Sequence, residues 1–154
     1  MRILSLCWKV IQLCFFRFYT VPYRNFLAFR RKGKLYLVFE YMEKNLLEVL
    51  EEQVQGLDAD TVKYFTYQLT LAIHCCHSNH IIHRDIKPEN LLINLKSKCL
   101  KLCDFGFARF IEPFDELTDY VATRWYRAPE LLLGSTSYTF AVDVWAIGIA
   151  FYYY

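Results

Sequence analysis

Glycine is scarce in this sequence of 154 residues. The chain contains five glycines, and no two of them are separated by a single residue. Loops that cradle a nucleotide's phosphates commonly use a G-x-G spacing, because glycine lets the backbone approach the ligand closely. The sequence therefore contains no glycine-rich phosphate-binding loop. Its glycines are Gly33, Gly56, Gly106, Gly134 and Gly148.

Acidic residues are absent from the first 39 positions, which carry eight Lys or Arg, although the whole chain has a net charge of only +2. A one-sided basic segment can bind nucleic acid or an anionic membrane. This segment is also strongly aromatic and lacks the Gly/Ser composition of a disordered tail. We therefore interpret it as a partly buried piece of a folded protein and expect no nucleic-acid partner.

Paired-cysteine motifs are also absent. The six cysteines include no C-x-x-C spacing, and His77 beside Cys75 and Cys76 does not complete a zinc-binding pattern. The sequence thus argues against the common structural zinc sites. We expect buried thiols in a reducing compartment instead.

No apolar run at the N-terminus is long enough to cross a membrane. Lys9 and Arg17 interrupt the apolar residues of "MRILSLCWKVIQLCFFRF", whereas a membrane helix needs about 20 in succession. No small-residue cleavage site follows, which argues against a signal peptide. A protein of the cytoplasm or nucleus is the prediction, with an amphipathic arm on a membrane surface as the alternative.

Hydrophobic periodicity in the first half of the chain predicts one strand and two helices. The β-rich run "LYLVFEY" at 35–41 is expected to be a buried strand. A short amphipathic helix at 45–53 precedes a longer helix that begins at Asp58 or Asp60. The longer helix carries an apolar stripe at spacings of three and four residues: Val62, Phe65, Leu69, Ala72 and Cys76.

The second half predicts a β-ribbon, a long loop and a final helix. Short strands at 91–93 and 99–103 flank a turn, and a polar loop follows at 104–128. The stretch 140–154 is apolar nearly all round, which predicts a helix buried on every side. The layout is an α+β fold that is mostly helical.

Four polar residues next to this ribbon indicate phosphate chemistry. Asp85 and Asn90 stand in "HIIHRDIKPENLLI", and Asp104 follows the second strand, so the ribbon can bring them to one cleft. Carboxylate and amide oxygens are ligands that suit Mg²⁺. Lys87 is spaced to reach the same cleft and neutralise a transferring phosphoryl group. Together these residues favour phosphoryl transfer.

Three sequence motifs, in this order, connect this chemistry with a known protein family. "HRDIKPEN" at 83–90, "DFG" at 104–106 and "APE" at 128–130 resemble the protein-kinase signature, and "DVWAIG" follows them. Lys87 is typical of serine/threonine kinases. "VATRWYRAPE" resembles the branch that contains cyclin-dependent and MAP kinases. "KLCDFGFAR", "HRDIKPENLL" and "KLYLVFEYMEKNLLEVLEE" are most similar to the cyclin-dependent kinase-like family. The resemblance covers residues 28–148 and implies a kinase fold that is mostly large lobe with a remnant of the small lobe.

The resemblance implies roles for five residues in the transfer of a phosphoryl group from ATP. Asp85 would accept the proton of the substrate hydroxyl, and Lys87 would contact the γ-phosphate. Thr123 would bridge these two side chains. Asn90 and Asp104 would hold Mg²⁺.

It also implies a site for the adenine base. Phe39 would be the gatekeeper of that pocket, and the backbones of Glu40 and Met42 would bind the base. Leu92 would form the floor beneath it.

A regulatory site follows from "TDY" at 118–120, which is similar to a Thr-x-Tyr switch. Arg84 and Arg109 would bind a phosphate on Thr118 or Tyr120 and thereby order the loop. An upstream kinase or autophosphorylation would supply that phosphate.

Four further residues would support the site. His83 is expected to be packed in the interior rather than to act as an acid. Phe105 is likewise expected to support the structure of the site. Asp143 would brace the catalytic loop from below. Glu130 would be buried without the arginine that pairs with it in the family, and breaking such a pair costs about 3–5 kcal/mol.

Two interpretations stay open. Residues 1–27 and 149–154 match nothing in the family, and neither a glycine-rich lid nor a lysine in a "VAIK"-like strand is present. The chain is either a truncated, poorly active serine/threonine kinase or a non-catalytic kinase-like fragment that binds partners as a decoy. The active form would phosphorylate a protein substrate, and Arg127 in "TRWYRAPE" resembles loops that favour a proline after the target residue.

Overall fold

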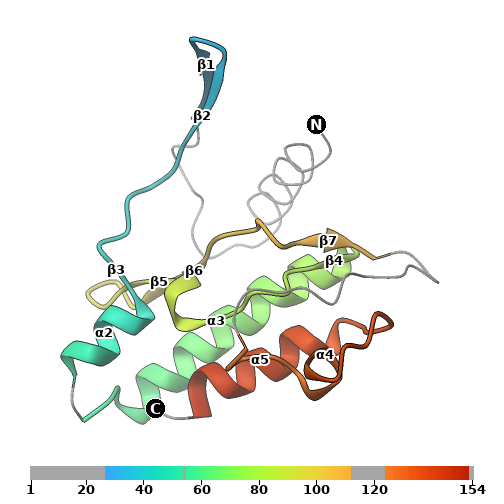
Figure 1. Cartoon of the computed structure of the whole chain (residues 1–154). Coiled ribbons are helices and arrows are strands. Elements are labelled where there is room, and N and C mark those ends of the chain that lie inside the picture. The colour runs from blue at the N-terminus through green and yellow to red at the C-terminus, as the bar shows by residue number, and fades with distance from the viewer. Residues whose placement is uncertain (1–26, 54, 112–123, 153–154) are drawn as a thin grey trace.

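The structure is a computed structural model, and it describes residues 27–53, 55–111 and 124–152. A β-hairpin projects from one side, while helices and short ribbons form the main body (Figure 1). The elements are β1 Leu27–Arg31, β2 Lys34–Val38, β3 Lys44–Asn45, α2 Leu46–Glu52, α3 Ala59–Ser78, β4 Ile81–Ile82, η1 Pro88–Asn90, β5 Leu91–Asn94, β6 Cys99–Leu102, β7 Arg109–Phe110, α4 Pro129–Leu132 and α5 Ala141–Tyr152.

The projecting hairpin corrects the prediction of a buried strand at 35–41. β2 pairs with β1 in an antiparallel two-stranded sheet, and its turn places Gly33 at φ 73°. Tyr36 and Val38 are each 42% exposed, and Phe29 stacks on Tyr36 with ring centroids 5.2 Å apart. The apolar pattern identified the strand correctly. It could not show whether another layer covers the strand.

Capping residues start both α2 and α3. Asn45 accepts a hydrogen bond from the amide of Glu48, and the Glu48 side chain accepts one from the amide of Asn45. This reciprocal pair satisfies two amides at the start of α2. Asp58, one of the two predicted caps, accepts from the amide of Thr61 at 2.9 Å and caps α3. Phe65 and Leu69 of the predicted stripe are fully buried.

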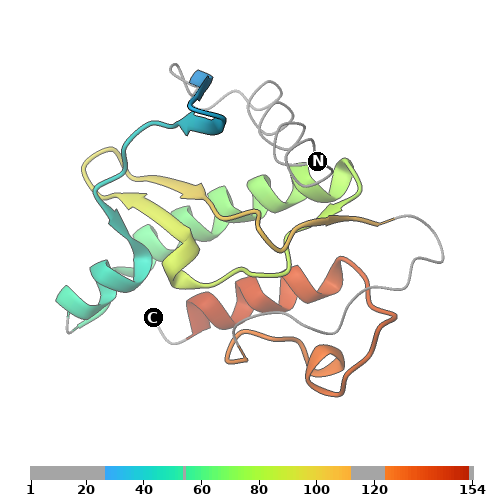
Figure 2. The same ribbon diagram turned by 45° about the horizontal axis from the view of Figure 1, so that its top comes forward.

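The core lies where α3 packs on a small sheet. The sheet has the strand order β3-β5-β6, and α3 contacts both β6 and α5. Both views show α3 and α5 side by side beneath the ribbons (Figures 1 and 2). Leu69, Ile86 and Leu91 belong to one buried apolar cluster between these layers. Through Ile86 and Leu91, the cluster fixes the middle and the far end of the polar stretch that follows β4.

The predicted loop at 104–128 contains a short strand. β7 pairs antiparallel with β4, with Ile82 opposite Arg109 and Ile81 opposite Phe110. The prediction that this stretch is loop throughout was therefore wrong. Two residues are too few for a periodic signal, and the pairing depends on a partner some 28 positions earlier in the chain.

Helix α5 is buried on one face and open on the other, so the prediction of burial on every side was wrong. Asp143 and Ala150 are buried, whereas Val144 is 59% and Trp145 45% exposed. Within the described ranges no element covers the face that carries Val144 and Trp145. No helix in the described part of the chain is both long and apolar enough to span a membrane.

Candidate active site

The polar stretch His83–Asn90 runs between β4 and β5 and is almost wholly buried. His83 is inaccessible, and Asp85 is 5% exposed. Ile86 anchors the stretch in the core, and Pro88 starts the single turn η1 with a fixed backbone angle. We call residues 83–90 the catalytic loop from here on, after the motif they contain. The fold holds this loop by burial at both of its ends.

Two predicted residues of the catalytic loop, Lys87 and Asn90, converge on the carboxylate of a third, Asp85. Lys87 Nζ lies 3.1 Å from Asp85 Oδ2. Asn90 Nδ2 donates to the same Oδ2 at 3.0 Å and to the backbone carbonyl of Asp85 at 2.8 Å. A cation and an amide thus hold the Asp85 carboxylate in one orientation. Asp85 and Lys87 were predicted to share a cleft, and the structure brings them into contact.

The β5–β6 ribbon brings Asn90 next to Asp104. Leu91 pairs with Leu102, and the amide of Cys103 donates to the backbone carbonyl of Asn90 at 2.9 Å. Asp104 therefore begins its segment at the ribbon end that carries Asn90. Because both amide hydrogens of Asn90 face Asp85, its side-chain oxygen is the atom left to bind a cation.

Asp104 has a local geometry that holds its carboxylate. Its φ is 58°, in the left-handed region that side chains adopt at a cost. The carboxylate accepts a hydrogen bond from the amide of Gly106 at 3.1 Å, and Asp104 is exposed. A Cβ at Gly106 would lie 3.0 Å from this carboxylate oxygen. Glycine at 106 thus keeps the Asp104 side chain in place.

His83 joins the catalytic loop to the segment that carries Asp104. Its Nε2 lies 3.1 Å from the carbonyl oxygen of Cys103, and its ring meets that of Phe105 edge-on at 4.8 Å. Burial lowers the pKa of His83, because desolvation disfavours the imidazolium. A neutral, enclosed ring agrees with a packing role for His83.

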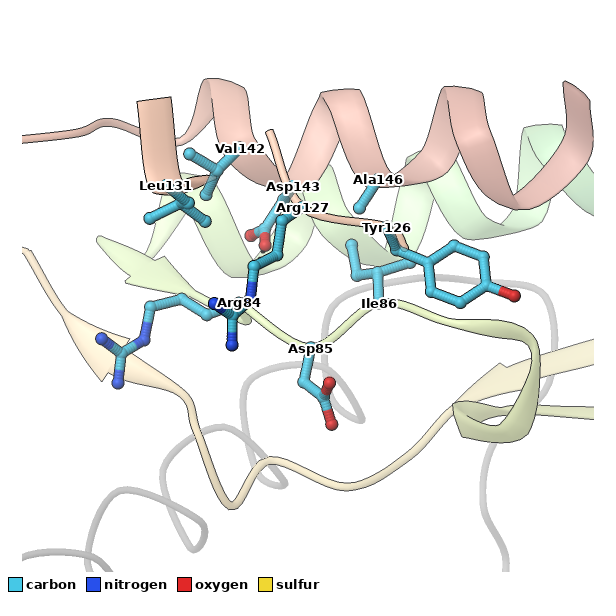
Figure 3. Close-up of a pocket in the computed structure, with 9 residues that line it drawn as sticks. All are labelled: Arg84, Asp85, Ile86, Tyr126, Arg127, Leu131, Val142, Asp143 and Ala146. Carbon is cyan, nitrogen blue, oxygen red and sulfur yellow. Dashed lines mark hydrogen bonds between the residues drawn. The ribbon is translucent and has the colours of Figure 1, made fainter. Parts of the chain in front are cut away.

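Asp143 lies directly beneath the catalytic loop. This residue of α5 is 1% exposed and accepts hydrogen bonds from the amides of His83 and Arg84 at 2.9 and 2.8 Å. Arg84 has a φ of 69°. Figure 3 shows Asp143 pointing from α5 toward the loop, while Asp85 points away from α5. The carboxylate thus holds the loop from the side opposite the cleft, at the position predicted for a brace.

Arg84 links three segments of the chain. Its Nε donates to the carbonyl of Phe107 at 2.7 Å, and a terminal nitrogen donates to the hydroxyl of Tyr138 at 2.8 Å. Arg109, predicted to act with Arg84, lies on β7 and donates to the carbonyl of Ala108. Both guanidinium groups therefore bond to backbone carbonyls between Asp104 and β7. Thr118, Tyr120 and Thr123 lie outside the described residues, so their predicted roles stay predictions.

The segment predicted to hold adenine is tied to the ribbon through its acidic side chain. The Glu40 carboxylate forms an ion pair with Lys101, whose side chain is 7% exposed. Lys101 lies opposite Leu92 in the β5–β6 register, so the predicted floor is close to this ion pair. Phe39 is 45% exposed, and Met42 is half-buried.

A narrow pocket lies between the catalytic loop and α5 (Figure 3). Its apolar wall includes Val142 and Ala146, and Arg127 lines it as well. Arg127 Nε is buried and makes no hydrogen bond within the described part of the chain.

Glu130, three residues later, is only half-buried. The expectation that Glu130 is a buried charge was therefore wrong, because α4 leaves one side of it open to solvent.

No group of three or more His, Cys, Asp or Glu side chains could hold a metal in residues 27–53, 55–111 and 124–152. One carboxylate and one amide oxygen fit a cation that takes its remaining ligands from water and phosphate, as Mg²⁺ does.

The family model of the protein kinase domain matches residues 23–154. The chain belongs to the protein kinase domain family.

Within curated proteins, this kinase domain is similar to cyclin-dependent kinase-like proteins. It is 61% identical over 123 residues to cyclin-dependent kinase-like 5 of Mus musculus, covering 79% of the chain and 13% of that protein. It is 54% identical to cyclin-dependent kinase-like 4 of Mus musculus over 80% of the chain and 36% of that protein. Cyclin-dependent kinase-like 2 of Homo sapiens is 54% identical over 77% of the chain, which covers 24% of it. The chain thus spans between an eighth and just over a third of these relatives.

These findings confirm the predicted resemblance and the α+β kinase fold. The matched range 23–154 is wider than the predicted 28–148 at both ends. Sequence reasoning missed three residues that hold the kinase site together: His77 beneath Asp143, Tyr138 at Arg84, and Lys101 at Glu40. Of these three residues, only Lys101 could have been recognised from the sequence, because a charged residue between apolar strand positions often has a buried partner.

Proposed function

We propose that this kinase domain carries the catalytic residues of a serine/threonine protein kinase that transfers the γ-phosphoryl group of ATP to protein hydroxyls. The observation that carries the proposal is the convergence of Lys87 and Asn90 on Asp85. Phosphoryl transfer depends mainly on positioning and charge stabilisation, and this arrangement provides both. The similarity to relatives named as cyclin-dependent kinase-like proteins supports the same activity.

Asp85 would orient the substrate hydroxyl and accept its proton as the new P–O bond forms and the bond between the γ-phosphorus and the ADP leaving group breaks. The carboxylate needs a fixed direction for that role, and the hydrogen bond from Asn90 to Oδ2 provides it, while a second bond from Asn90 holds the Asp85 backbone carbonyl. Lys87 would place its positive charge between the carboxylate and the transferred group. Its ammonium would thereby reduce the repulsion between two anions that must approach each other.

The oxygens of Asn90 and Asp104 would hold Mg²⁺, which neutralises phosphate charge during transfer. Glu40 and Met42 would present backbone groups to adenine, with Leu92 beneath the ring. The ion pair between Glu40 and Lys101 supports this placement because it ties the segment to β6. ATP and Mg²⁺ are thus the proposed cofactors.

The proposal also includes the kinase's preference for certain target sequences and its regulation by phosphorylation. Arg127 lies beside the catalytic loop, and its Nε is buried. The segment "TRWYRAPE" that contains it resembles loops that favour a proline after the target residue, so we propose that preference here. Arg84 and Arg109 would bind a phosphate on Thr118 or Tyr120. We place the protein in the cytoplasm or nucleus.

Purified chain, Mg·ATP and paired Ser-Pro and Ser-Ala peptides test this function. We expect slow transfer, faster for the Ser-Pro peptide, because the sequence contains no glycine-rich loop to cover the phosphates. Asp85→Asn should abolish the transfer without unfolding the chain. Transfer that survives Asp85→Asn would refute the proposed role of this carboxylate.

A binding function is the second candidate, and the open face of α5 favours it. Val144, Trp145 and Tyr152 are exposed on that face, and apolar groups of this size commonly mark an interaction surface. Calorimetry with Mg·ATP separates the two functions. A folded chain that binds no nucleotide and transfers no phosphate would support the binding function and contradict the enzymatic one.

A further inference from the structure

The hairpin of β1 and β2 carries a dense group of positive charges at its tip. Four exposed cations lie close together in the sequence: Arg30, Arg31, Lys32 and Lys34. No acidic residue precedes Glu40, and no ion pair of the described residues involves any of these four side chains. The hairpin also projects away from the main body (Figure 1). We call these four residues the basic tip.

A tight turn fixes the spacing of the cations. Lys32 and Gly33 have φ angles of 50° and 73°, and a two-residue turn that matches the twist of a β-ribbon needs positive φ at both positions. Arg31 is directly opposite Lys34 in the register of the two strands. Residues opposite each other share a face of the ribbon, with Cβ atoms about 5 Å apart. Two like charges therefore stand side by side on one face.

The same face carries a pair of aromatic rings that stiffens the hairpin. Phe29 is opposite Tyr36, and the two rings stack with centroids 5.2 Å apart and an angle of 7° between their planes. Cross-strand aromatic pairs of this kind stabilise a β-ribbon. The basic tip is thus presented on a preformed support, so a ligand need not order it.

An anion would relieve an unfavourable arrangement of charge. Like charges directly opposite each other destabilise a β-ribbon. Charged strand edges can serve to prevent aggregation, but charges of both signs would do so without this repulsion. A ligand with several carboxylates would place negative charge between Arg31 and Lys34. The guanidinium can also bind a carboxylate through two parallel hydrogen bonds.

An acidic polypeptide fits this surface better than a nucleic acid or a membrane does. Single-stranded nucleic acid stacks its bases on open aromatic faces, whereas Phe29 and Tyr36 already stack on each other. A membrane-surface segment inserts apolar side chains, whereas Lys32 and Gly33 form the far end of this hairpin. An extended peptide places alternate side chains on one side, about 7 Å apart. Neighbouring carboxylates can therefore reach both strands of the tip.

We propose that the basic tip is a docking site for an acidic segment of the protein substrate. β2 continues directly into residues 39–42, and the ion pair of Glu40 with Lys101 ties that segment to β6. A substrate held at the tip therefore stays at a high effective concentration around the catalytic loop. The inference rests on the proposed function in that the partner is taken as a substrate. Binding of an acidic segment can be measured without any turnover.

Two double substitutions remove equal charge from different places. Arg31→Gln/Lys34→Gln, the tip variant, neutralises the opposed pair. Lys63→Gln/Lys96→Gln is the matched control, because both lysines are exposed, on α3 and in the turn between β5 and β6. Both variants are made in the full chain. Neither should lower the Tm, since all four side chains are exposed.

Fluorescence anisotropy is the first measurement. The probe is a labelled decapeptide of alternating Glu and Ala, and a Gln/Ala decapeptide is its uncharged counterpart. We expect wild type and the control to bind the acidic probe at least about tenfold more tightly than the uncharged one, with the difference shrinking as salt is added. The tip variant should lose about three- to tenfold in affinity for the acidic probe, as expected for two exposed charge pairs.

Several results of this titration would overturn the proposal. Equal affinity of wild type for the acidic and the uncharged probe is one. An equal loss in the control and the tip variant is another, since net charge alone would then explain the binding. Tighter binding of an oligothymidine or of phosphatidylserine vesicles than of the acidic probe would indicate a nucleic acid or a membrane as the partner instead.

Transfer kinetics are the second measurement. A Ser-Pro peptide extended by the acidic decapeptide should show a KM about tenfold lower than the unextended peptide, with kcat unchanged. The tip variant should lose this gain and keep the kcat of wild type. A gain that persists in the tip variant would contradict the docking role. If the wild-type chain transfers no phosphate, the proposed function fails, and the anisotropy experiment still decides whether the basic tip binds an acidic segment.

Discussion

Lys87 Nζ lies 3.1 Å from Oδ2 of Asp85, two positions earlier in the chain. The Asp85 side chain is 3% exposed, so this cation faces the carboxylate in a place of limited hydration. A transferred phosphoryl group would bring further negative charge to the same point. On the proposed function, the γ-phosphate of a bound nucleotide would lie beside this pair.

Replacement of Lys87 should distinguish ATP from ADP. In Lys87→Met we expect the Kd for Mg·ATP to rise about tenfold, because one charge-assisted contact to the γ-phosphate is lost. The Kd for Mg·ADP should stay unchanged, since ADP has no γ-phosphate. Isothermal titration calorimetry of the full chain with both nucleotides measures the two constants.

Lys96→Met is the control for this comparison, because Lys96 is exposed in the turn between β5 and β6. We expect it to bind both nucleotides as wild type does. An equal loss of affinity for ATP and ADP in Lys87→Met would contradict the placement of this lysine at the γ-phosphate.

Gly106→Ala should weaken the proposed magnesium site with little effect on folding. The added Cβ would come 3.0 Å from the Asp104 carboxylate oxygen, and the end of that exposed side chain can move away. We expect the Mg²⁺ concentration for half-maximal ATP binding to rise, and the free energy of unfolding to change by less than about 1 kcal/mol. A Mg²⁺ titration at fixed ATP and a urea melt measure these quantities.

Gly148→Ala is the matched control, since a Cβ there would meet no atom within 4 Å. Alanine is the better helix former in the interior of α5, by up to about 1 kcal/mol. This variant should be as stable as wild type or more so, with unchanged Mg²⁺ dependence. A shifted Mg²⁺ dependence in both variants would show that the effect does not come from Asp104.

The cap of α3 should give the stability of the chain a pH dependence in acid. The Thr61 hydroxyl and then the Thr61 amide lower the pKa of Asp58 from its ordinary value of 3.8, because both donate to the ionised carboxylate. The unfolded chain therefore binds a proton more readily at this residue than the folded chain does. This contribution is fully present above the ordinary value and is lost as the pH falls through the folded pKa.

Asp58→Asn isolates that contribution, because asparagine caps a helix but does not ionise. Between pH 6 and pH 3, we expect the Tm of wild type to fall more steeply than that of Asp58→Asn. Asp60→Asn, in the first turn of α3, should follow wild type. Parallel slopes for wild type and Asp58→Asn would show that the cap does not contribute to the acid sensitivity.

The local elements of this fold could be predicted because neighbouring residues specify them. Asp58 starts α3, and a turn divides β5 from β6 as the pattern indicated. What covers each element could not be predicted. The pattern of 35–41 is apolar whether or not a layer packs on β2, and α5 leaves Val144 and Trp145 exposed.

The candidate site also has residues that the sequence could name and contacts that it could not. Motif order and spacing were enough to name Asp85, Lys87, Asn90 and Asp104, since their chemical types and separations resemble one family. The sequence could not indicate that His77 reaches Asp143, 66 positions later. It could not indicate that Tyr138 bonds Arg84 either. Such contacts depend on how α3, α5 and the loop before α5 pack, and that packing is a property of the whole folded chain rather than of any short segment.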